Sequence, residues 1–511
     1  MKKVLSLILS LLMIFSCVSV ATVSAYSADH LPQIYVEGLD SKRIYYKEDT
    51  AEENPLFFPI DGNMLLTNLM KYEKYLKEAV TKKDPNLLNT YISLWMDDCF
   101  GDIALEKDGA TSSEKVWLPE TELNPYGDNK YVFKFDCRLD PVDIAKELYE
   151  VYIPMVQKAT GSQKFELVSS SFGTSIVLAL VNEYPAVKED IDSFLLCVPS
   201  VNGVNFAGEL FSGNFDVDPA ALKAFVETNV ADDEISLLLS TLLKTGTLDF
   251  LLDSMVEPVL KAALLDALKN VVRDIFGTMP AMWTFVDDRY FYDALKYTYG
   301  EDYASEDHEY AGLISKITYY HENIKNRTYD IMSDLQASGI HTNIVCKYGN
   351  APIPVSKEGN FLGDGFVAVE MASFGATCTM SGKKFADDYQ QAKYPEKNYM
   401  SPDWCIDAST CLLPNNTWFI KNLNHGVKTD GYYEMLNTII YDDLDVFTSE
   451  RYPQYLIVPA EDDEAVVPLA GYMESTEQEE VKETTWLEDF LAFLKGIFPR
   501  LIEWIKGLFN K

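Results

Sequence analysis

The chain has 511 residues and a formal net charge of −36, with 47% apolar and 13% aromatic residues. This apolar content can form a sizeable core, which argues against global disorder. Nucleic-acid binding needs basic surface for phosphate contacts, so the acidic balance argues against that class as well. The length fits two or three ordinary domains, or one large α/β domain with insertions.

The N-terminus has the layout of a secretory signal. A basic start at residues 2–3 precedes an apolar run at 4–15 and a small-residue cleavage site that ends at Ala25. A lipoprotein signal with Cys17 as the lipidated residue fits less well, because bulky Phe15 stands where such signals prefer small residues. We therefore expect an extracytoplasmic protein, secreted or at the cell surface, of bacterial type.

Seven cysteines follow the predicted cleavage site, and an odd number in so long a chain does not indicate a disulfide framework. Cys197 and Cys346 lie in apolar, strand-like runs and are interpreted as small buried hydrophobic residues. Cys405 and Cys411 could close one loop. No C-x-x-C pair or histidine cluster indicates zinc, and the sequence points to no metal or other cofactor.

Strands and helices alternate over the first part of the mature chain. The strand at 34–36 ends in Glu37-Gly38, where glycine permits a turn. The other elements expected here are helices at 64–81, 85–95 and 141–160 and strands at 131–135, 165–168 and 194–198. Such alternation predicts an α/β fold with a doubly wound, mostly parallel sheet.

The alternation stops near Asn205, and residues 219–276 are almost wholly helical and apolar in pattern. We expect a helical cap over the sheet, because ligands of open α/β sheets bind beyond the carboxyl ends of the strands. A plain helical subdomain is the alternative. The expected elements after it are a helix at 309–336, a strand at 342–347, a turn at 363–365, a last β-like run at 417–423 and a closing helix at 432–441.

The C-terminal part differs from the rest. Residues 459–485 are polar and acidic, which predicts a linker without a packed core. Residues 486–511 carry a wide apolar stripe at helical spacing, interrupted by Gly496 and Pro499. This segment is too interrupted and too charged to span a membrane, but it could lie in a membrane interface, bind a partner or fold back on the body.

The predicted organisation is a signal peptide at 1–25, a core at 26–204, a cap insertion at 205–335, the second part of the core at 336–458, a linker at 459–485 and an amphipathic helix at 486–511.

The stretch 164–181 has the layout of a nucleophile elbow. A short strand leads to a turn centred on Ser171, and an apolar helix begins at Phe172. An elbow needs small residues two before and two after the serine, so that strand and helix can approach. Gly173 meets the second requirement, whereas Ser169 replaces glycine at the first. The alternative is a serine-rich turn without chemistry.

A nucleophilic serine needs a base to take its proton and an acid to orient that base. Of the five histidines, only His425 follows a late strand at a loop position. Asp364 precedes it in a Gly-Asp-Gly turn, which gives the order serine, acid, histidine. The alternatives are a loop histidine without a role and an Asp-Gly turn selected for its backbone conformation. Asp430 is less suitable, since a helix-cap role explains it.

Two backbone N–H groups complete the predicted site. Phe172 directly follows the serine, and Leu39 lies in the loop after the first strand. Together they are the expected oxyanion hole, and because the donors are backbone groups, the side chains are unconstrained.

At this point the chain resembles the lecithin:cholesterol acyltransferase-like branch of the α/β-hydrolases. Phe-Asp-Cys-Arg ending at Arg138 resembles its Tyr-Asp-Trp-Arg, the turn from Gly363 resembles its Gly-Asp-Gly-Thr-Val, and the elbow matches in part. Where the branch has His-Gly, this chain has Glu37-Gly38. The resemblance covers blocks between residues 32 and 440 and implies Ser171, Asp364 and His425 as the triad.

The sequence thus predicts a secreted serine hydrolase that cleaves carboxylic esters, lipid esters first, through an acyl-enzyme on Ser171; transfer to another acceptor stays open. One alternative is a non-catalytic surface or binding protein with the same fold, favoured by Glu37 and the missing elbow glycine. Another is a peptidase of this fold. The expected partners are an ester or lipid molecule and, through residues 486–511, a membrane or cell envelope, with no nucleic acid.

Overall fold

The computed structural model describes residues 30–39, 41, 43–46, 68, 71–82, 84–111, 116–214, 269–352 and 361–476. The predicted signal peptide, most of the 219–276 block and the amphipathic segment at 486–511 lie outside these residues. Within the described ranges, no helix combines the length and apolar character needed to cross a membrane.

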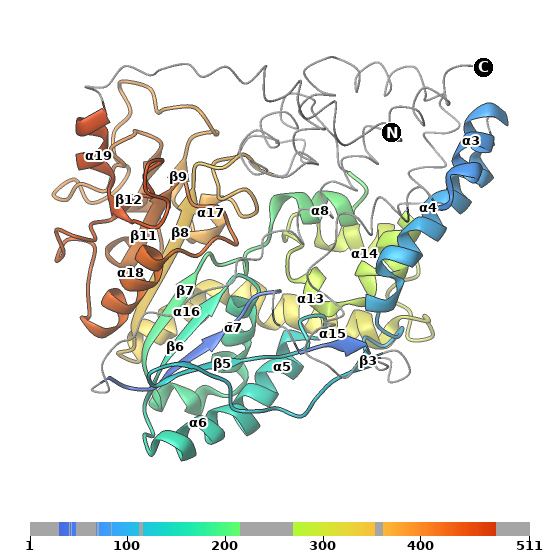
Figure 1. The fold of residues 1–511 in the computed structure, drawn as a ribbon, viewed down its shortest axis with the longest axis horizontal. Helices are drawn as coiled ribbons and strands as arrows, with labels where there is room; N and C mark the ends of the chain where they lie inside the picture. Colours follow the sequence, from blue (N-terminus) through green and yellow to red (C-terminus); the bar gives the residue numbers. More distant parts are fainter. Residues whose placement is uncertain are drawn as a thin grey trace.

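A nine-stranded sheet forms the centre of the described part (Figure 1), in the order β13-β12-β11-β8-β7-β6-β1-β5-β4. All neighbouring pairs are parallel except β4–β5 and β12–β13, which are antiparallel at the two edges. The strands are β1 (Gln33–Val36), β4 (Pro125–Gly127), β5 (Lys130–Phe133), β6 (Phe165–Ser170), β7 (Ile191–Cys197), β8 (His341–Tyr348), β11 (Thr417–Lys421), β12 (Tyr455–Ile457) and β13 (Val467–Pro468). The expectation of a mixed α/β fold with a mostly parallel sheet is confirmed.

Both faces of the sheet are covered, which explains why its central strands are apolar runs without alternation. Successive residues of a strand point to opposite faces. On β6, Leu167 packs into the core shared with helix α7 (Gly173–Glu183), whereas Val168 packs into the core beneath α18 (Asp430–Tyr441). The same division separates Leu196 from Leu195 on β7.

The remaining helices are α3 (Glu73–Lys82), α4 (Pro85–Phe100), α5 (Pro141–Glu147), α6 (Ile153–Thr160), α8 (Asn205–Phe211), α13 (Pro280–Trp283), α14 (Phe291–Tyr299), α15 (Ala311–Asn323), α16 (Thr328–Ala337), α17 (Val369–Ala372) and α19 (Leu469–Thr476). A π turn at Leu148–Tyr152 joins α5 to α6, whose second residue, Pro154, has no N–H for the helical ladder. Of the region predicted as a cap (205–335), α8, α13, α14, α15 and most of α16 are described, and α8, α13 and α14 lie together beside the sheet (Figure 1). Their role as a cap stays a prediction.

Two pairs of short strands lie outside the main sheet. β2 (Tyr45–Tyr46) pairs with β3 (Val116–Trp117), and β9 (Thr377–Cys378) pairs with β10 (Ile406–Asp407), in both cases antiparallel. The loop that holds β10 contains Cys405 and Cys411, which are free thiols, so the predicted loop closure by these two residues is wrong.

The order of the strands sets the position of the site. After β1 the chain adds β5 on one side of it and then β6 on the other, so the winding reverses at β1. In open α/β sheets, ligands bind at such a switch point, outside the carboxyl ends of the strands. Ser171 follows the carboxyl end of β6.

Three further sequence predictions are corrected. The run at 417–423 is not the last strand, because β12 and β13 follow it in the sheet. Residues 459–476 are not a linker, because β13 pairs with β12 and Leu469 at the start of α19 is fully buried. The helix expected at 309–336 is two helices, which a short 3₁₀ turn after Ile324 separates.

Candidate active site

Ser171 lies in a strained turn between β6 and α7. Its φ is 52°, in the left-handed region that residues other than glycine rarely adopt. Its N–H donates to the carbonyl of Cys197 at 3.0 Å, and its carbonyl accepts from Thr174 N–H at 2.9 Å. Ser171 is partly exposed, whereas Ser169 and Ser170 are buried, so the turn presents one of the three adjacent serines.

The two elbow positions at which small residues are expected, 169 and 173, differ in how closely their surroundings are packed. A Cβ on Gly173 would lie 2.3 Å from the carbonyl oxygen of Glu37 and 2.4 Å from that of Val36, so the start of α7 packs directly against the end of β1. At the other position, Ser169 is buried and its hydroxyl donates to the carbonyl of Leu195 at 3.4 Å. The strand therefore accommodates a hydroxymethyl group at this position, and glycine is not required.

His425 follows β11 and lies between the serine and the acid. Its Nδ1 is 2.7 Å from Asp364 Oδ2, and its Nε2 is 2.8 Å from Ser171 Oγ. With the ring proton on Nδ1 facing the carboxylate, Nε2 accepts from the serine hydroxyl. The side chains of His425 and Asp364 are 9% and 1% exposed, so this chain of hydrogen bonds is largely shielded from water. The structure brings the three predicted residues together.

The Asp364 turn is built to present a carboxylate. Oδ1 accepts from the N–H groups of Phe366 at 2.9 Å and Val367 at 2.7 Å, which leaves Oδ2 for the histidine. Gly365 has a φ of 95°, and a Cβ on Gly363 would lie 2.4 Å from the carbonyl oxygen of Val367. The two glycines flanking Asp364 are thus needed for the backbone conformation of the turn, as the alternative interpretation held. The turn also directs the Asp364 carboxylate towards His425.

The predicted oxyanion donors lie on two segments that meet at the elbow. Within the described residues, the N–H groups of Phe172 and Leu39 donate to no protein acceptor. Both side chains are buried, which fixes the turns that carry them. Glu37 lies close enough to Tyr152 to affect its phenol, whose pKa is raised by burial first and then by this carboxylate.

Five buried phenylalanines form a connected cluster that reaches the ring of His425. The ring of Phe366 lies 4.9 Å from that of His425, and it contacts Phe206 at 5.2 Å and Phe285 at 5.9 Å between centroids. A further chain of contacts, each at 6.1 Å, runs from Phe285 to Phe172 and from Phe172 to Phe135. This aromatic cluster (Phe135, Phe172, Phe206, Phe285 and Phe366) joins the elbow, the acid turn and the segments of α8 and α13.

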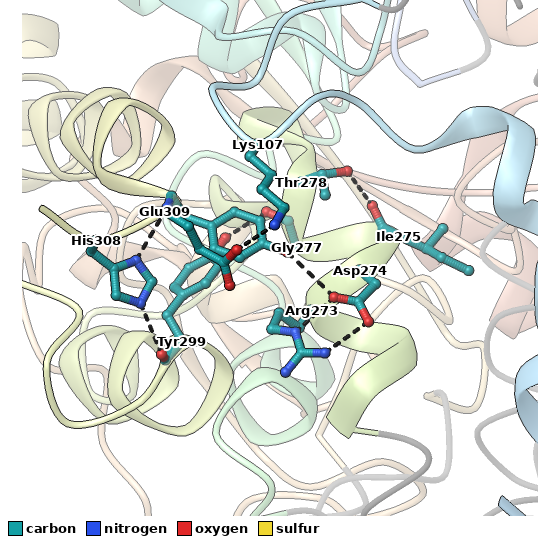
Figure 2. Close-up of polar contacts among 10 residues, drawn as sticks. Lys107, Arg273, Asp274, Ile275, Gly277, Thr278, Tyr299, His308 and Glu309 are labelled. Carbon is teal, nitrogen blue, oxygen red and sulfur yellow. Dashed lines mark hydrogen bonds and ion pairs between the residues drawn. The ribbon is translucent and has the colours of Figure 1, made fainter.

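The other four histidines have structural partners. His308 Nε2 lies 3.1 Å from the carbonyl oxygen of Tyr299. Figure 2 shows this contact beside the ion pair of Lys107 with Glu309. The other ring nitrogen of His308 accepts from Tyr310 N–H at 3.2 Å. His30 stacks on Tyr441, His321 stacks on Phe291 with a pKa lowered by burial to about 4, and His341 contacts Asp443.

Comparison with known proteins adds little to this geometry. No family model and no curated protein matches the chain. Among solved structures, the Tle4–Tli4 complex is similar with a TM-score of 0.24 and 11% identity, covering 63% of this chain and 75% of that chain. The prohormone-processing carboxypeptidase Kex1Δp from Saccharomyces cerevisiae has a TM-score of 0.22 and 11% identity, with 70% of each chain covered. Both TM-scores are low. The mostly parallel sheet and the geometry of the site are compatible with an α/β-hydrolase.

Proposed function

We propose that this protein is an extracytoplasmic serine hydrolase of the α/β-hydrolase fold that cleaves carboxylic esters through an acyl-enzyme on Ser171. The observation that carries the proposal is the hydrogen-bonded chain from Ser171 through His425 to Asp364, with distances of 2.8 Å and 2.7 Å. It lies at the carboxyl end of the strands, where this architecture binds ligands.

In the first half of the reaction, Ser171 Oγ attacks the carbonyl carbon of the ester while His425 Nε2 takes its proton. Asp364 holds the imidazole by its Nδ1–H and stabilises the imidazolium that forms. The negative charge that develops on the carbonyl oxygen is stabilised by the N–H groups of Phe172 and Leu39. The tetrahedral intermediate collapses as His425 gives its proton to the leaving oxygen, and the alcohol departs.

In the second half, a water molecule replaces the alcohol. His425 takes a proton from the water as its oxygen attacks the acyl carbon, and then returns that proton to Ser171 Oγ. The carboxylic acid leaves and the serine is regenerated. Attack by another alcohol in place of water would transfer the acyl group, and the same residues serve both outcomes.

Lipid or other apolar esters are the proposed substrates. The aromatic cluster beside His425 offers an apolar environment to an acyl chain. The resemblance in sequence to the lecithin:cholesterol acyltransferase-like branch favours the same class. Contact of residues 486–511 with a membrane or cell envelope is part of this proposal and is supported by their apolar stripe alone.

The proposal is tested by hydrolysis of aryl esters of increasing acyl length. The wild-type protein should hydrolyse them with a preference for longer chains, and Ser171→Ala should lose about 10⁴-fold or more in kcat/KM. Ser169→Ala is the matched control, because it removes a neighbouring hydroxyl that is buried on the strand. Undiminished hydrolysis by Ser171→Ala, or no hydrolysis of any ester by the wild type, would contradict the proposal; the latter favours the non-catalytic alternative.

A further inference from the structure

A buried lysine supports the loop that carries His425. Lys347 lies near the carboxyl end of β8 and is 2% exposed. Its neighbours on the strand, Cys346 and Tyr348, are fully buried. Burial of an ammonium group costs free energy unless hydrogen bonds compensate for the lost water.

Three carbonyl groups of one loop accept hydrogen bonds from this ammonium group. Lys347 Nζ donates to the carbonyl of His425 at 3.1 Å, to that of Asn424 at 3.3 Å and to that of Val427 at 2.5 Å. An ammonium has three N–H donors, and here all three find acceptors within four consecutive residues. The ring of Tyr432, on the helix that follows the loop, lies 4.5 Å from Nζ and adds a cation–π contact.

These bonds complete the attachment of the His425 backbone. On its amino side, the N–H of His425 donates to the carbonyl of Asp364 at 3.0 Å. On its other side, the carbonyl of His425 accepts from Lys347. With both backbone groups held, only the side-chain torsions remain free, and the bonds of the ring to Asp364 and Ser171 fix those.

We infer that Lys347 is a positioning residue for the reaction proposed above, on which this inference rests. It anchors the His425 loop to the sheet so that the imidazole stays within hydrogen-bond distance of both partners. A displacement of a catalytic group by about 1 Å can cost about 100-fold in rate. Lys347 touches the loop backbone and not the serine, so its loss should lower kcat and leave KM within about twofold.

The test compares three single substitutions in the full chain. Lys347→Met keeps most of the volume and removes the three donors, whereas Lys347→Arg keeps a cation with several donors in a different geometry. Lys130→Met is the control, because Lys130 is also buried in the sheet (4% exposed) and donates to a neutral acceptor, Asn437 Oδ1, at 2.7 Å. Lys130 is the first residue of β5 and lies at the amino ends of the parallel strands, whereas Ser171 lies beyond their carboxyl ends.

Two measurements separate positioning from stability. The first is the rate of labelling by a fluorophosphonate, read beside the melting temperature and the steady-state constants. The second is the low-field proton NMR signal of a histidine Nδ1–H bound to a carboxylate, assigned by its loss in Asp364→Asn. A residue that only stabilises the fold would change the melting temperature and leave both readouts as in the wild type.

We expect Lys347→Met to label and turn over about 10- to 100-fold more slowly, with a weakened low-field signal. Lys347→Arg should lie between it and the wild type, and Lys130→Met should label at the wild-type rate. A wild-type rate in Lys347→Met, or equal slowing in Lys130→Met, would overturn the inference. If Lys347→Met does not fold, Lys347→Arg is the deciding variant. Labelling of Lys347→Arg at the wild-type rate would then contradict the inference. Absent labelling of the wild type, or labelling of Ser171→Ala, would instead refute the proposed function.

Discussion

Within the described residues, two histidine–aspartate pairs have the same N–O distance and lie at opposite ends of the sheet's parallel strands. His425 Nδ1 lies 2.7 Å from Asp364 Oδ2, beyond the carboxyl end of β11. His341 Nδ1 lies 2.7 Å from Asp443 Oδ1, at the start of β8. By distance alone the two pairs are indistinguishable.

They differ in burial and in the third partner. The Asp364 side chain is 1% exposed and holds two backbone N–H groups besides the ring, whereas the Asp443 side chain is 80% exposed. The second nitrogen of His425 faces the Ser171 hydroxyl, and that of His341 lies 3.2 Å from the amide of Asn416. An exposed ion pair contributes little free energy, while a buried and fully bonded one fixes a geometry. A histidine–acid distance thus identifies a site only together with its nucleophile and its shielding.

The two histidines should differ most in their effect on activity. His425→Ala removes the base and should lower kcat/KM by about 10⁴-fold. His341→Ala, made in parallel, should stay within about twofold of the wild type, because its ring contacts no nucleophile. Ester hydrolysis at saturating and limiting substrate measures both. Comparable losses in the two variants would remove the distinction between the pairs.

Substitution of the two aspartates should give the same order of activity losses as substitution of the two histidines, but the losses should be smaller. Asp364→Asn offers an amide to the ring in place of a carboxylate and so disturbs its tautomer, which should cost about 10³-fold in kcat. Asp443→Asn changes an exposed partner and should be nearly silent in activity and in melting temperature. An active Asp364→Asn enzyme would mean that another group orients His425.

The elbow beside the catalytic residues should also tolerate an added methyl group less well than helix α19 does. In Gly173→Ala, the new Cβ meets backbone atoms of β1 at 2.3 and 2.4 Å, which should destabilise the fold by about 1–3 kcal/mol. Gly471→Ala in α19 is the control, because its Cβ has no atom within 4 Å and alanine favours the helix. Denaturant unfolding measures both. Equal stability of the two variants would show that the elbow relaxes around the methyl group.

A substitution at Glu166, near the amino end of β6, should change only the free energy of unfolding, and the change should depend on pH. Burial first, and then the Asp192 carboxylate, raises the pKa of Glu166 from 4.5 to about 8. Between these values the folded state keeps a proton that the unfolded state releases, so this group lowers stability as the pH rises from about 4.5 to about 8.

Glu166→Gln removes that dependence. The variant should therefore be more stable than the wild type at pH 9, by an amount on the order of 3–5 kcal/mol, and equal to it at pH 4. Thermal unfolding at the two values gives the comparison. A constant difference across pH would show that Glu166 does not titrate in this range.

The core strands and the three predicted site residues were accessible from sequence for definite reasons. Strands buried on both faces are uninterrupted apolar runs, and β6, β7 and β8 all have this form. The chain has five histidines, and only His425 follows a late strand at a loop position, so its place in the sequence distinguishes it from the other four. Gly173, two residues after Ser171, distinguishes this serine from Ser169 and Ser170, and the close contact of Gly173 with β1 gives the physical reason.

Other features have no such signal. β12, β13 and α19 are short, and polar residues between them dilute the few buried ones, such as Leu469, in any local composition. The role of Lys347 depends on carbonyl groups 77 to 80 residues further along the chain, and backbone acceptors leave no mark on a sequence. The aromatic cluster likewise collects phenylalanines from separate segments.

The most direct test of the central claim is the site of covalent labelling. The full chain is incubated with a fluorophosphonate, digested and mapped by mass spectrometry. One adduct per chain is expected, on Ser171, and this labelling should be absent from Ser171→Ala, strongly slowed in His425→Ala and unchanged in His341→Ala. An adduct that persists in Ser171→Ala, or a wild-type protein that stays unlabelled, would contradict the central claim.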